Sequence, residues 1–169
     1  MSGPCVLLEM RRATKSGLRI ADGLIWAGAG LFLVALAVSA WVVPELRVLH
    51  VLQALLYVAV VVLARRGNVW GFGAGAVVAL AWNGMNLVLT HLMQAGAVAF
   101  WWMLKTGDVR RLDTMMVLVG GVGHFVLAGG CVIGVLSRGS ERRRWWEFAG
   151  GGVAALGYMA LIIAIARPR

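Results

Sequence analysis

Five long stretches without a charged residue constrain this chain more than any other feature. They are Gly23–Pro44, Val48–Ala64, Gly67–Leu104, Thr114–Ser137 and Phe148–Ala166. Each approaches or exceeds the roughly 20 apolar residues that cross a ~30 Å hydrocarbon core. Because a backbone in lipid must satisfy its own hydrogen bonds, such segments form helices, whereas a transmembrane barrel would show short alternating segments. The sequence predicts an all-α fold, a polytopic transmembrane helical bundle.

Composition and charge set the expected partners. Hydrophobic residues make up 61% of the 169 residues and charged residues 14%, whereas a soluble domain is about a quarter charged. A net charge of +9 can indicate nucleic-acid binding, but here the basic residues fall in tails, loops or span ends. Topology signals and contact with anionic headgroups explain that placement. We expect a lipid bilayer as partner and no nucleic acid.

The charge pattern divides the chain into tails and spans. We expect a cytoplasmic N-terminal tail (1–21), a single transmembrane domain (22–166) and a C-terminal tail (167–169). The domain is predicted to hold six spans, at about 22–43, 45–64, 68–82, 87–105, 114–137 and 146–166. The basic and apolar N-terminal pattern also fits a signal peptide, but the apolar stretch continues to Val43. We therefore expect that segment to be retained as the first span.

The run from Gly67 to Leu104 leaves the number of spans open. As one helix it would be roughly 55 Å long at 1.5 Å per residue, too long for a single crossing. Asn83-Gly84 is a dipeptide typical of turns, and a turn there gives six spans. The alternative keeps one crossing in this run and lays the remainder in the membrane interface, which gives five.

Two patterns favour six spans with a cytoplasmic N-terminus. Six spans put eleven Lys and Arg residues inside and five outside, whereas five spans put ten inside and six outside. Tryptophan concentrates at membrane interfaces, and a turn at Asn83 would bring Trp82 to an interface like the other seven tryptophans.

Two segments suggest an internal 3+3 repeat. Trp70–Trp82 reads WGFGAGAVVALAW and Trp146–Tyr158 reads WEFAGGGVAALGY, with several residue types in register. Units of three spans would have inverted topology, a plan common in secondary transporters. Chance is the competing explanation, because Ala, Val, Gly and Leu fill the chain.

Polar side chains inside the spans are the candidate site residues. His50, Gln53 and Tyr57 recur at i, i+3 and i+7, so they share one helix face that should point into the bundle. Hydrogen bonding between helices is one interpretation of this face, and a ligand pocket or ion path is the other. His124 and Cys131 share a face in a glycine-rich span, where Gly130-x-x-x-Gly134 would admit a neighbouring backbone.

The segment Ala81–Gly96 carries the other candidates. They are Trp82, Asn83, Asn86, His91 and Gln94. On an uninterrupted helix Asn83, Asn86, Thr90 and Gln94 would form a deep polar stripe, whereas a turn would put Asn83 and Asn86 at a pocket mouth or in a plain connection. We favour the turn. We expect no metal site and no cofactor, with a haem held by two of the three histidines as the alternative.

The remaining patterns exclude more functions than they indicate. All seven acidic residues lie in tails, loops or span ends, so the spans lack the carboxylates of proton relays and of paired-carboxylate catalysis. We expect a non-enzymatic protein of a bacterial inner membrane that binds or transports a small uncharged or weakly polar solute. The alternative is an accessory or assembly subunit of a larger membrane complex, with protein partners or a homo-oligomer.

Overall fold

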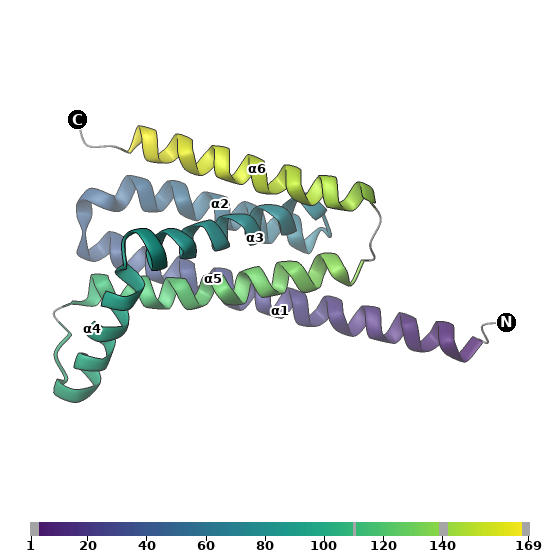
Figure 1. Cartoon of the computed structure of the whole chain (residues 1–169), viewed down its shortest axis with the longest axis horizontal. Coiled ribbons are helices and arrows are strands. Elements are labelled where there is room, and N and C mark those ends of the chain that lie inside the picture. The colour runs from purple at the N-terminus through teal and green to yellow at the C-terminus, as the bar shows by residue number, and fades with distance from the viewer. Residues whose placement is uncertain (1–3, 110, 139–141, 167–169) are drawn as a thin grey trace.

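The computed structural model (Figure 1) describes residues 4–109, 111–138 and 142–166, and every element in these ranges is helical. In chain order the elements are α1 (Pro4–Val42), the 3₁₀-helix η1 (Pro44–Leu46), α2 (Arg47–Arg65), α3 (Val69–Gly84), the π-helix η2 (Met85–Leu89), α4 (Leu92–Thr106), α5 (Leu112–Leu136) and α6 (Arg142–Ile165). The predicted all-α class is confirmed.

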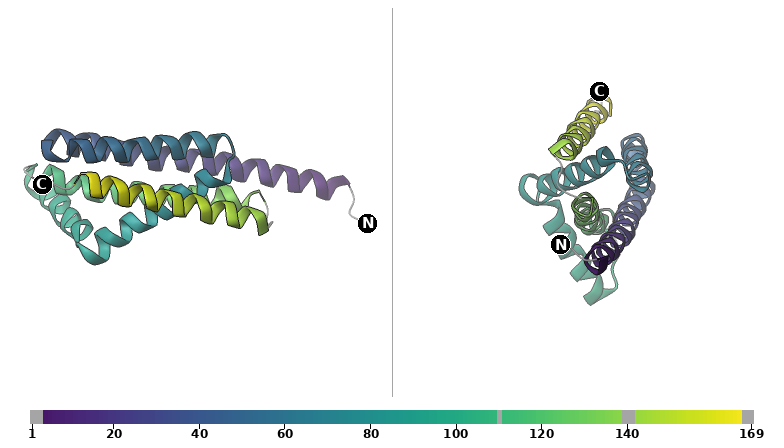
Figure 2. Two further views of the ribbon diagram at one scale, coloured as in Figure 1. Left: turned by 90° about the horizontal axis from the view of Figure 1, so that it is seen from above. Right: turned by 90° about the vertical axis from the view of Figure 1, so that its right-hand side faces the viewer.

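Five helical segments are long and apolar enough to cross a membrane, which supports membrane insertion. They are Lys15–Val42, Pro44–Arg65, Val69–Leu89, Leu112–Leu136 and Arg144–Ile165. Figures 1 and 2 show these segments side by side, with α4 set steeply against one end of the bundle. With 15 residues, α4 is roughly 22 Å long, shorter than a ~30 Å hydrocarbon core.

The predicted turn at Asn83-Gly84 is wrong. Helix α3 continues through both residues into η2, and the direction changes at Thr90 and His91, where His91 has a left-handed φ of 53°. A turn at Asn83 would free backbone groups in mid-bundle, where no water can satisfy them. The predicted division into spans 68–82 and 87–105 therefore becomes Val69–Leu89 followed by the shorter α4.

Local hydrogen bonds explain why the break falls seven residues later than predicted. The Thr90 amide donates to the Met85 carbonyl at 3.0 Å, which closes the wide turn of the π-helix. The Gln94 side chain donates to the Leu87 carbonyl at 2.7 Å. The last carbonyls of a helix have no partner within the helix, and here two of them, those of Met85 and Leu87, accept these bonds. The chain can therefore change direction at Thr90 and His91 without leaving these carbonyls unpaired.

Glycines bring α1 and α5 into backbone contact. A Cβ at Gly123 would lie 2.8 Å from the Gly28 carbonyl oxygen, and one at Gly130 would lie 2.9 Å from the Ile25 nitrogen. A Cβ at Gly129 would meet nothing within 4 Å. Close approach through small residues is the usual way in which membrane helices associate. Gly123 and Gly130 therefore form this contact, and Gly129 does not contribute to it.

The two segments of the suspected repeat pack against each other. A Cβ at Gly73 of α3 would collide with the Phe148 carbonyl of α6, and one at Gly151 would collide with the Trp70 carbonyl. Both helices run in the same direction along the bundle in Figure 1. Inverted repeats would set them in opposite directions, so the structure does not confirm the repeat.

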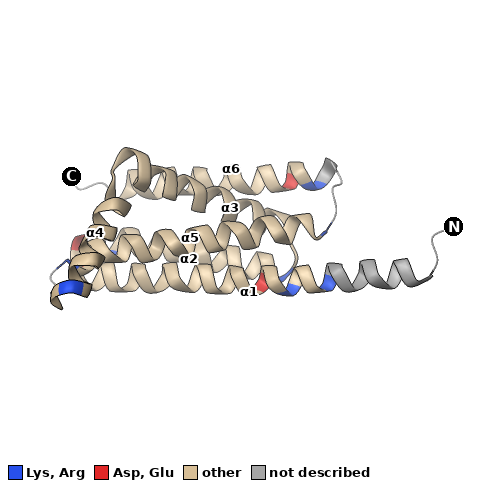
Figure 3. Cartoon of the chain, turned by 60° about the horizontal axis from the view of Figure 1, so that its bottom comes forward, with Lys and Arg blue, Asp and Glu red and all other residues tan. Residues whose placement is uncertain are grey.

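The described charges gather at the two ends of the bundle. Figure 3 shows Lys and Arg in blue and Asp and Glu in red, with tan helices between the two charged ends. The main buried cluster between these ends is built from α1, α2, α3, α5 and α6, whereas the buried side chains of α4, Met93 and Ala99, lie outside that cluster. Any site in mid-bundle must therefore work with neutral polar and aromatic groups.

Candidate functional site

A buried hydrogen bond joins α2 to α5 at the centre of the bundle. The hydroxyl of Tyr57 is bonded to Nε2 of His124, and both side chains are 0% exposed. The i, i+3, i+7 face of α2 places Tyr57 and Gln53 inward as predicted, with His50 half-buried nearer the helix start. Bonds of this type hold membrane helices together, so the pair fixes α2 against α5.

Aromatic rings enclose this pair. The Phe32 centroid lies 4.3 Å from that of Tyr57 and 4.1 Å from that of His124. The Trp82 centroid lies 4.7 Å from that of His124 and 5.6 Å from that of Phe32. Trp82 is therefore part of the bundle interior rather than a marker of the membrane surface, and α1, α2, α3 and α5 all contribute a ring.

Asn83 adds a second polar link between helices. It is 2% exposed, and its Nδ2 donates to the Gly121 carbonyl of α5 at 3.1 Å. Its Oδ1 and the Nδ1 of His124 have no hydrogen-bond partner among the described residues, although both atoms are buried. The Gly121 carbonyl that accepts from Asn83 and the imidazole of His124 come from positions three residues apart, about one turn of α5.

A cavity of about 250 Å³ lies beside the cluster, toward the η1 and α4 end of the bundle. It is lined by Phe32, Ala35, Leu36, Ser39, Leu46, Leu49, His50, Gln53, Trp82, Met85, Asn86, Leu92, Asp113, Met116 and Val117. Phe32 and Trp82 belong both to the lining and to the aromatic cluster, so they separate the cavity from the Tyr57–His124 pair. Asp113 is the one charged residue in this lining, and it lies in the first turn of α5.

Seven of the nine predicted site residues come together around this cavity and cluster. They are His50, Gln53, Tyr57, Trp82, Asn83, Asn86 and His124. The other two, His91 and Gln94, are exposed at the break before α4. Gln94 has a structural role there, because its amide bonds the Leu87 carbonyl.

Asn86 is buried, contrary to the surface position expected from a turn. It is 3% exposed, and its Nδ2 donates to the Trp82 carbonyl one turn earlier at 2.9 Å. Its Oδ1 lies 3.4 Å from the Thr90 hydroxyl. Asn86 also lines the cavity, so it can both stabilise the π-helix and contact an occupant.

Two of the three histidines considered for a haem have other surroundings in this structure. Nε2 of His124 is already bonded to Tyr57, aromatic rings pack against its imidazole, and His91 is exposed at the break. Among the described residues, no group of three or more His, Cys, Asp or Glu side chains could hold a metal ion. The arrangement is suited to hydrogen bonding and aromatic contact with a neutral molecule.

Sequence reasoning missed Phe32, Ser39 and Asp113. Phe32 sits in an apolar run where nothing distinguishes it from its neighbours, and only the fold brings it to Tyr57 and His124. Ser39 and Asp113 lie near helix ends, where polar residues are common. Only their proximity across α1 and α5 marks them as lining residues.

Comparison of the chain with protein-family models, curated proteins and solved structures found no match. Its function is therefore argued from the geometry of the site, because fold class alone supports many functions. The features available for a function are this cavity, with Asp113 as its one charged lining residue, and three buried atoms without a hydrogen-bond partner among the described residues, His50 Nδ1, Asn83 Oδ1 and His124 Nδ1.

Proposed function

We propose that this protein binds or transports a small, uncharged or weakly polar solute in the cavity between α1, α2, α3, η2 and α5. The observation that carries the proposal is the lining, which combines aromatic and aliphatic walls with His50, Gln53 and Asn86. Small-molecule sites have this character, being mainly apolar with a few placed polar groups.

The size and charge of the cavity narrow the solute class. At about 250 Å³, the cavity is slightly smaller than the ~300–1,000 Å³ typical of sites for drug-sized ligands, so the occupant is a small molecule. The amide groups of Gln53 and Asn86 can each donate and accept a hydrogen bond. A neutral alcohol, amide or heteroaromatic compound matches these groups without bringing an uncompensated charge into the bundle.

We further propose a location in a bacterial cytoplasmic membrane, with a cytoplasmic N-terminus. With five spans, a cytoplasmic N-terminus would put ten of the 16 Lys and Arg residues inside and six outside, in the sense that the positive-inside rule favours. Arg outnumbers Lys fourteen to two, which fits a GC-rich bacterial gene. In this topology α4 lies in the interface, where exposed Trp101 and Trp102 suit the headgroup region.

Thermal stabilisation by candidate solutes tests the proposal. The purified protein would be unfolded in detergent with small neutral alcohols, amides and heteroaromatic compounds. A solute at about 100 times its Kd should stabilise the folded state by about 2.7 kcal/mol. Gln53→Leu should abolish the stabilisation, because it removes a lining amide. Gln94→Leu is the matched control, since Gln94 lies outside the cavity, and should leave it unchanged.

The outcomes separate the proposal from its alternative, an accessory subunit of a membrane complex. Native purification followed by mass spectrometry should recover a monodisperse protein and a bound small molecule. Co-purification with fixed protein partners, instability without them and no stabilising solute would contradict solute binding and support the subunit. If the solute stabilises wild type and Gln53→Leu equally, it binds outside the cavity that Gln53 lines.

A further inference from the structure

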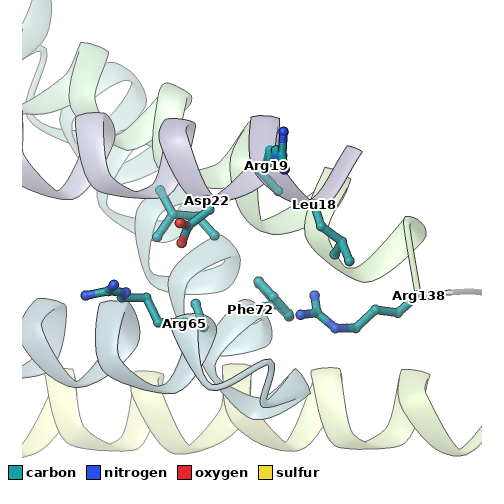
Figure 4. A pocket seen from close by; sticks show the side chains of 9 residues that line it. Leu18, Arg19, Asp22, Arg65, Phe72 and Arg138 are labelled. Atoms are coloured by element: carbon teal, nitrogen blue, oxygen red, sulfur yellow. The ribbon is translucent and has the colours of Figure 1, made fainter. Parts of the chain in front are cut away.

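A second cavity, of about 320 Å³, lies at the opposite end of the bundle between α1, α2, α3 and α5. It is lined by Leu18, Arg19, Ala21, Asp22, Ile25, Ala64, Arg65, Phe72 and Arg138 (Figure 4). The first cavity, called the central cavity below because it adjoins the Tyr57–His124 pair, has Asp113 as its one charged lining residue, whereas the second has charges of both signs in its walls. Its volume falls within the ~300–1,000 Å³ of small-molecule sites.

Arg138 is held in place as a rigid donor. Its guanidinium carbon lies 4.7 Å from the centre of the Phe72 ring, and its Nη1 donates to the Gly134 carbonyl at 3.1 Å. Figure 4 shows the guanidinium directed at Phe72, inside the cavity. Only one of its five N–H groups is used in that bond, so others remain for a ligand. Partial burial and the neighbouring Arg144 lower the pKa of Arg138, and a bound anion would relieve both effects.

Asp22 supplies the opposite charge. Figure 4 shows its carboxylate extending from α1 toward α2 and α3, while the head of Arg19 turns away from the cavity. Within the described part of the chain, Asp22 has no hydrogen bond or ion pair. Arg65 stacks instead on Trp26, with its guanidinium carbon 5.4 Å from the ring centre. The cavity thus presents a guanidinium and a carboxylate, neither of which neutralises the other by contact.

Exposed tryptophans place this cavity at the level of the lipid headgroups. Trp26 and Trp70, on the neighbouring turns of α1 and α3, are 48% and 46% exposed. Half-exposed tryptophan is typical of the membrane–water interface. Asp22 lies two turns inside the span Lys15–Val42, and Arg138 lies two residues beyond the span Leu112–Leu136, so both charges belong to the same end of the bundle.

We propose that this cavity binds an aminoalkyl phosphate group, with the phosphate on Arg138 and the ammonium at Asp22. A guanidinium forms strong charge-assisted hydrogen bonds with phosphate oxygens, and a carboxylate accepts from an ammonium group. The membrane source of this chemistry is a phosphatidylethanolamine headgroup, and the soluble source is free phosphoethanolamine. A phosphatidylglycerol headgroup carries the same phosphate but no ammonium, so it leaves the Asp22 carboxylate unpaired.

Native mass spectrometry with added lipid tests the assignment. Phosphatidylethanolamine and phosphatidylglycerol of the same acyl chains would be titrated onto the detergent-solubilised full-length protein. Wild type should prefer phosphatidylethanolamine by about tenfold, the scale of one charged hydrogen bond. Asp22→Asn should remove that preference, and Arg138→Gln should weaken binding of both lipids. Arg47→Gln at the opposite end is the control and should change neither affinity.

Further arms identify the source and protect the test from misfolding. Free phosphoethanolamine would be titrated alone, and binding as tight as that of the lipid would assign the cavity to a soluble phosphate ester. Arg138→Lys keeps the charge and should retain part of the phosphate affinity if Arg138→Gln fails to fold. The assignment is overturned if wild type binds the two lipids equally and if Asp22→Asn changes neither affinity.

Discussion

The two cavities lie toward opposite ends of the bundle and use different polar chemistry, because only the first adjoins the neutral cluster in mid-bundle. The central cavity adjoins a cluster of neutral groups, with Tyr57 bonded to His124 and Asn83 bonded to a backbone carbonyl. The end cavity is lined by Arg138 and Asp22. A charge in the middle of a membrane is costly, whereas at the interface water and headgroups solvate it. The chain thus places neutral polar groups deep and charged groups shallow.

The difference also separates the occupants that we propose. A neutral solute matches the amides of the central cavity, and a zwitterionic headgroup matches the charges of the end cavity. Both cavities depend on one scaffold, the close contact between α1 and α5, which contributes walls to each. Substitutions in that contact should damage both, whereas substitutions in the walls should affect one.

The largest expected effect is that of Gly130→Leu on the shared scaffold. A side chain at Gly130 would meet the backbone of α1 at Ala21 and Ile25, within 3.0 Å of its Cβ. Separating these helices should destabilise the protein by roughly 1–3 kcal/mol or more, as overpacking does. The unfolding midpoint in detergent measures this loss. Gly129→Leu, whose side chain would meet open space, should be nearly neutral, and equal loss in both variants would contradict the α1–α5 contact.

A smaller effect is expected in the neutral central cluster from Tyr57→Phe. The substitution leaves the buried His124 without its only hydrogen-bond partner among the described residues, at a cost of about 1–2 kcal/mol in unfolding free energy. Tyr158→Phe is the matched control, because its hydroxyl bonds the Leu52 carbonyl at 2.8 Å in a partly buried position. Tyr158→Phe should lower the unfolding free energy by about 0.5 kcal/mol, near the average for hydrogen bonds between membrane helices. A larger loss from Tyr158→Phe would show that the Tyr57–His124 bond is not the stronger link.

The smallest expected effect is a difference in salt dependence. Lipid binding at the end cavity relies on charges near the surface, so raising the ionic strength from about 0.01 to 0.1 M should weaken it a few-fold, as the Debye length falls from about 30 to 10 Å. Binding of a neutral solute in the central cavity should not change over the same range. Isothermal titration at both salt concentrations measures the contrast, and an equal response would remove the proposed distinction between the cavities.

Much of the fold could be predicted from sequence because charge placement and apolar length determine membrane helices. The same reasoning put Gln53 and Tyr57 on an inward face, since helical spacing fixes which residues share a side. It failed at Asn83-Gly84, where the dipeptide has a local preference for a turn. Inside a membrane bundle that preference is outweighed, because a turn would leave backbone groups without hydrogen bonds. The carbonyl of Gly121, which pairs with Asn83, lies 38 residues away and carries no sequence signal.

The end cavity escaped prediction for a different reason. Cations near span ends are normally topology signals, so nothing in the sequence set Arg138 apart from the other basic residues. Its distinguishing features are tertiary, namely the Phe72 ring beneath it and the Asp22 carboxylate in the same cavity. Local patterns identified the polar residues, but their pairing required the three-dimensional arrangement.

Cysteine accessibility on either side of the break tests most directly the central claim that Asn83 and Asn86 belong to the bundle interior. In a Cys5→Ser background, with Cys131 buried, Asn83→Cys and Thr90→Cys would be exposed to a bulky membrane-impermeant maleimide in intact membrane vesicles of both orientations. The structure predicts rapid labelling at Thr90 and shielding at Asn83, which is 2% exposed. Labelling of Asn83→Cys as fast as Thr90→Cys would contradict the account and restore a surface turn at Asn83-Gly84.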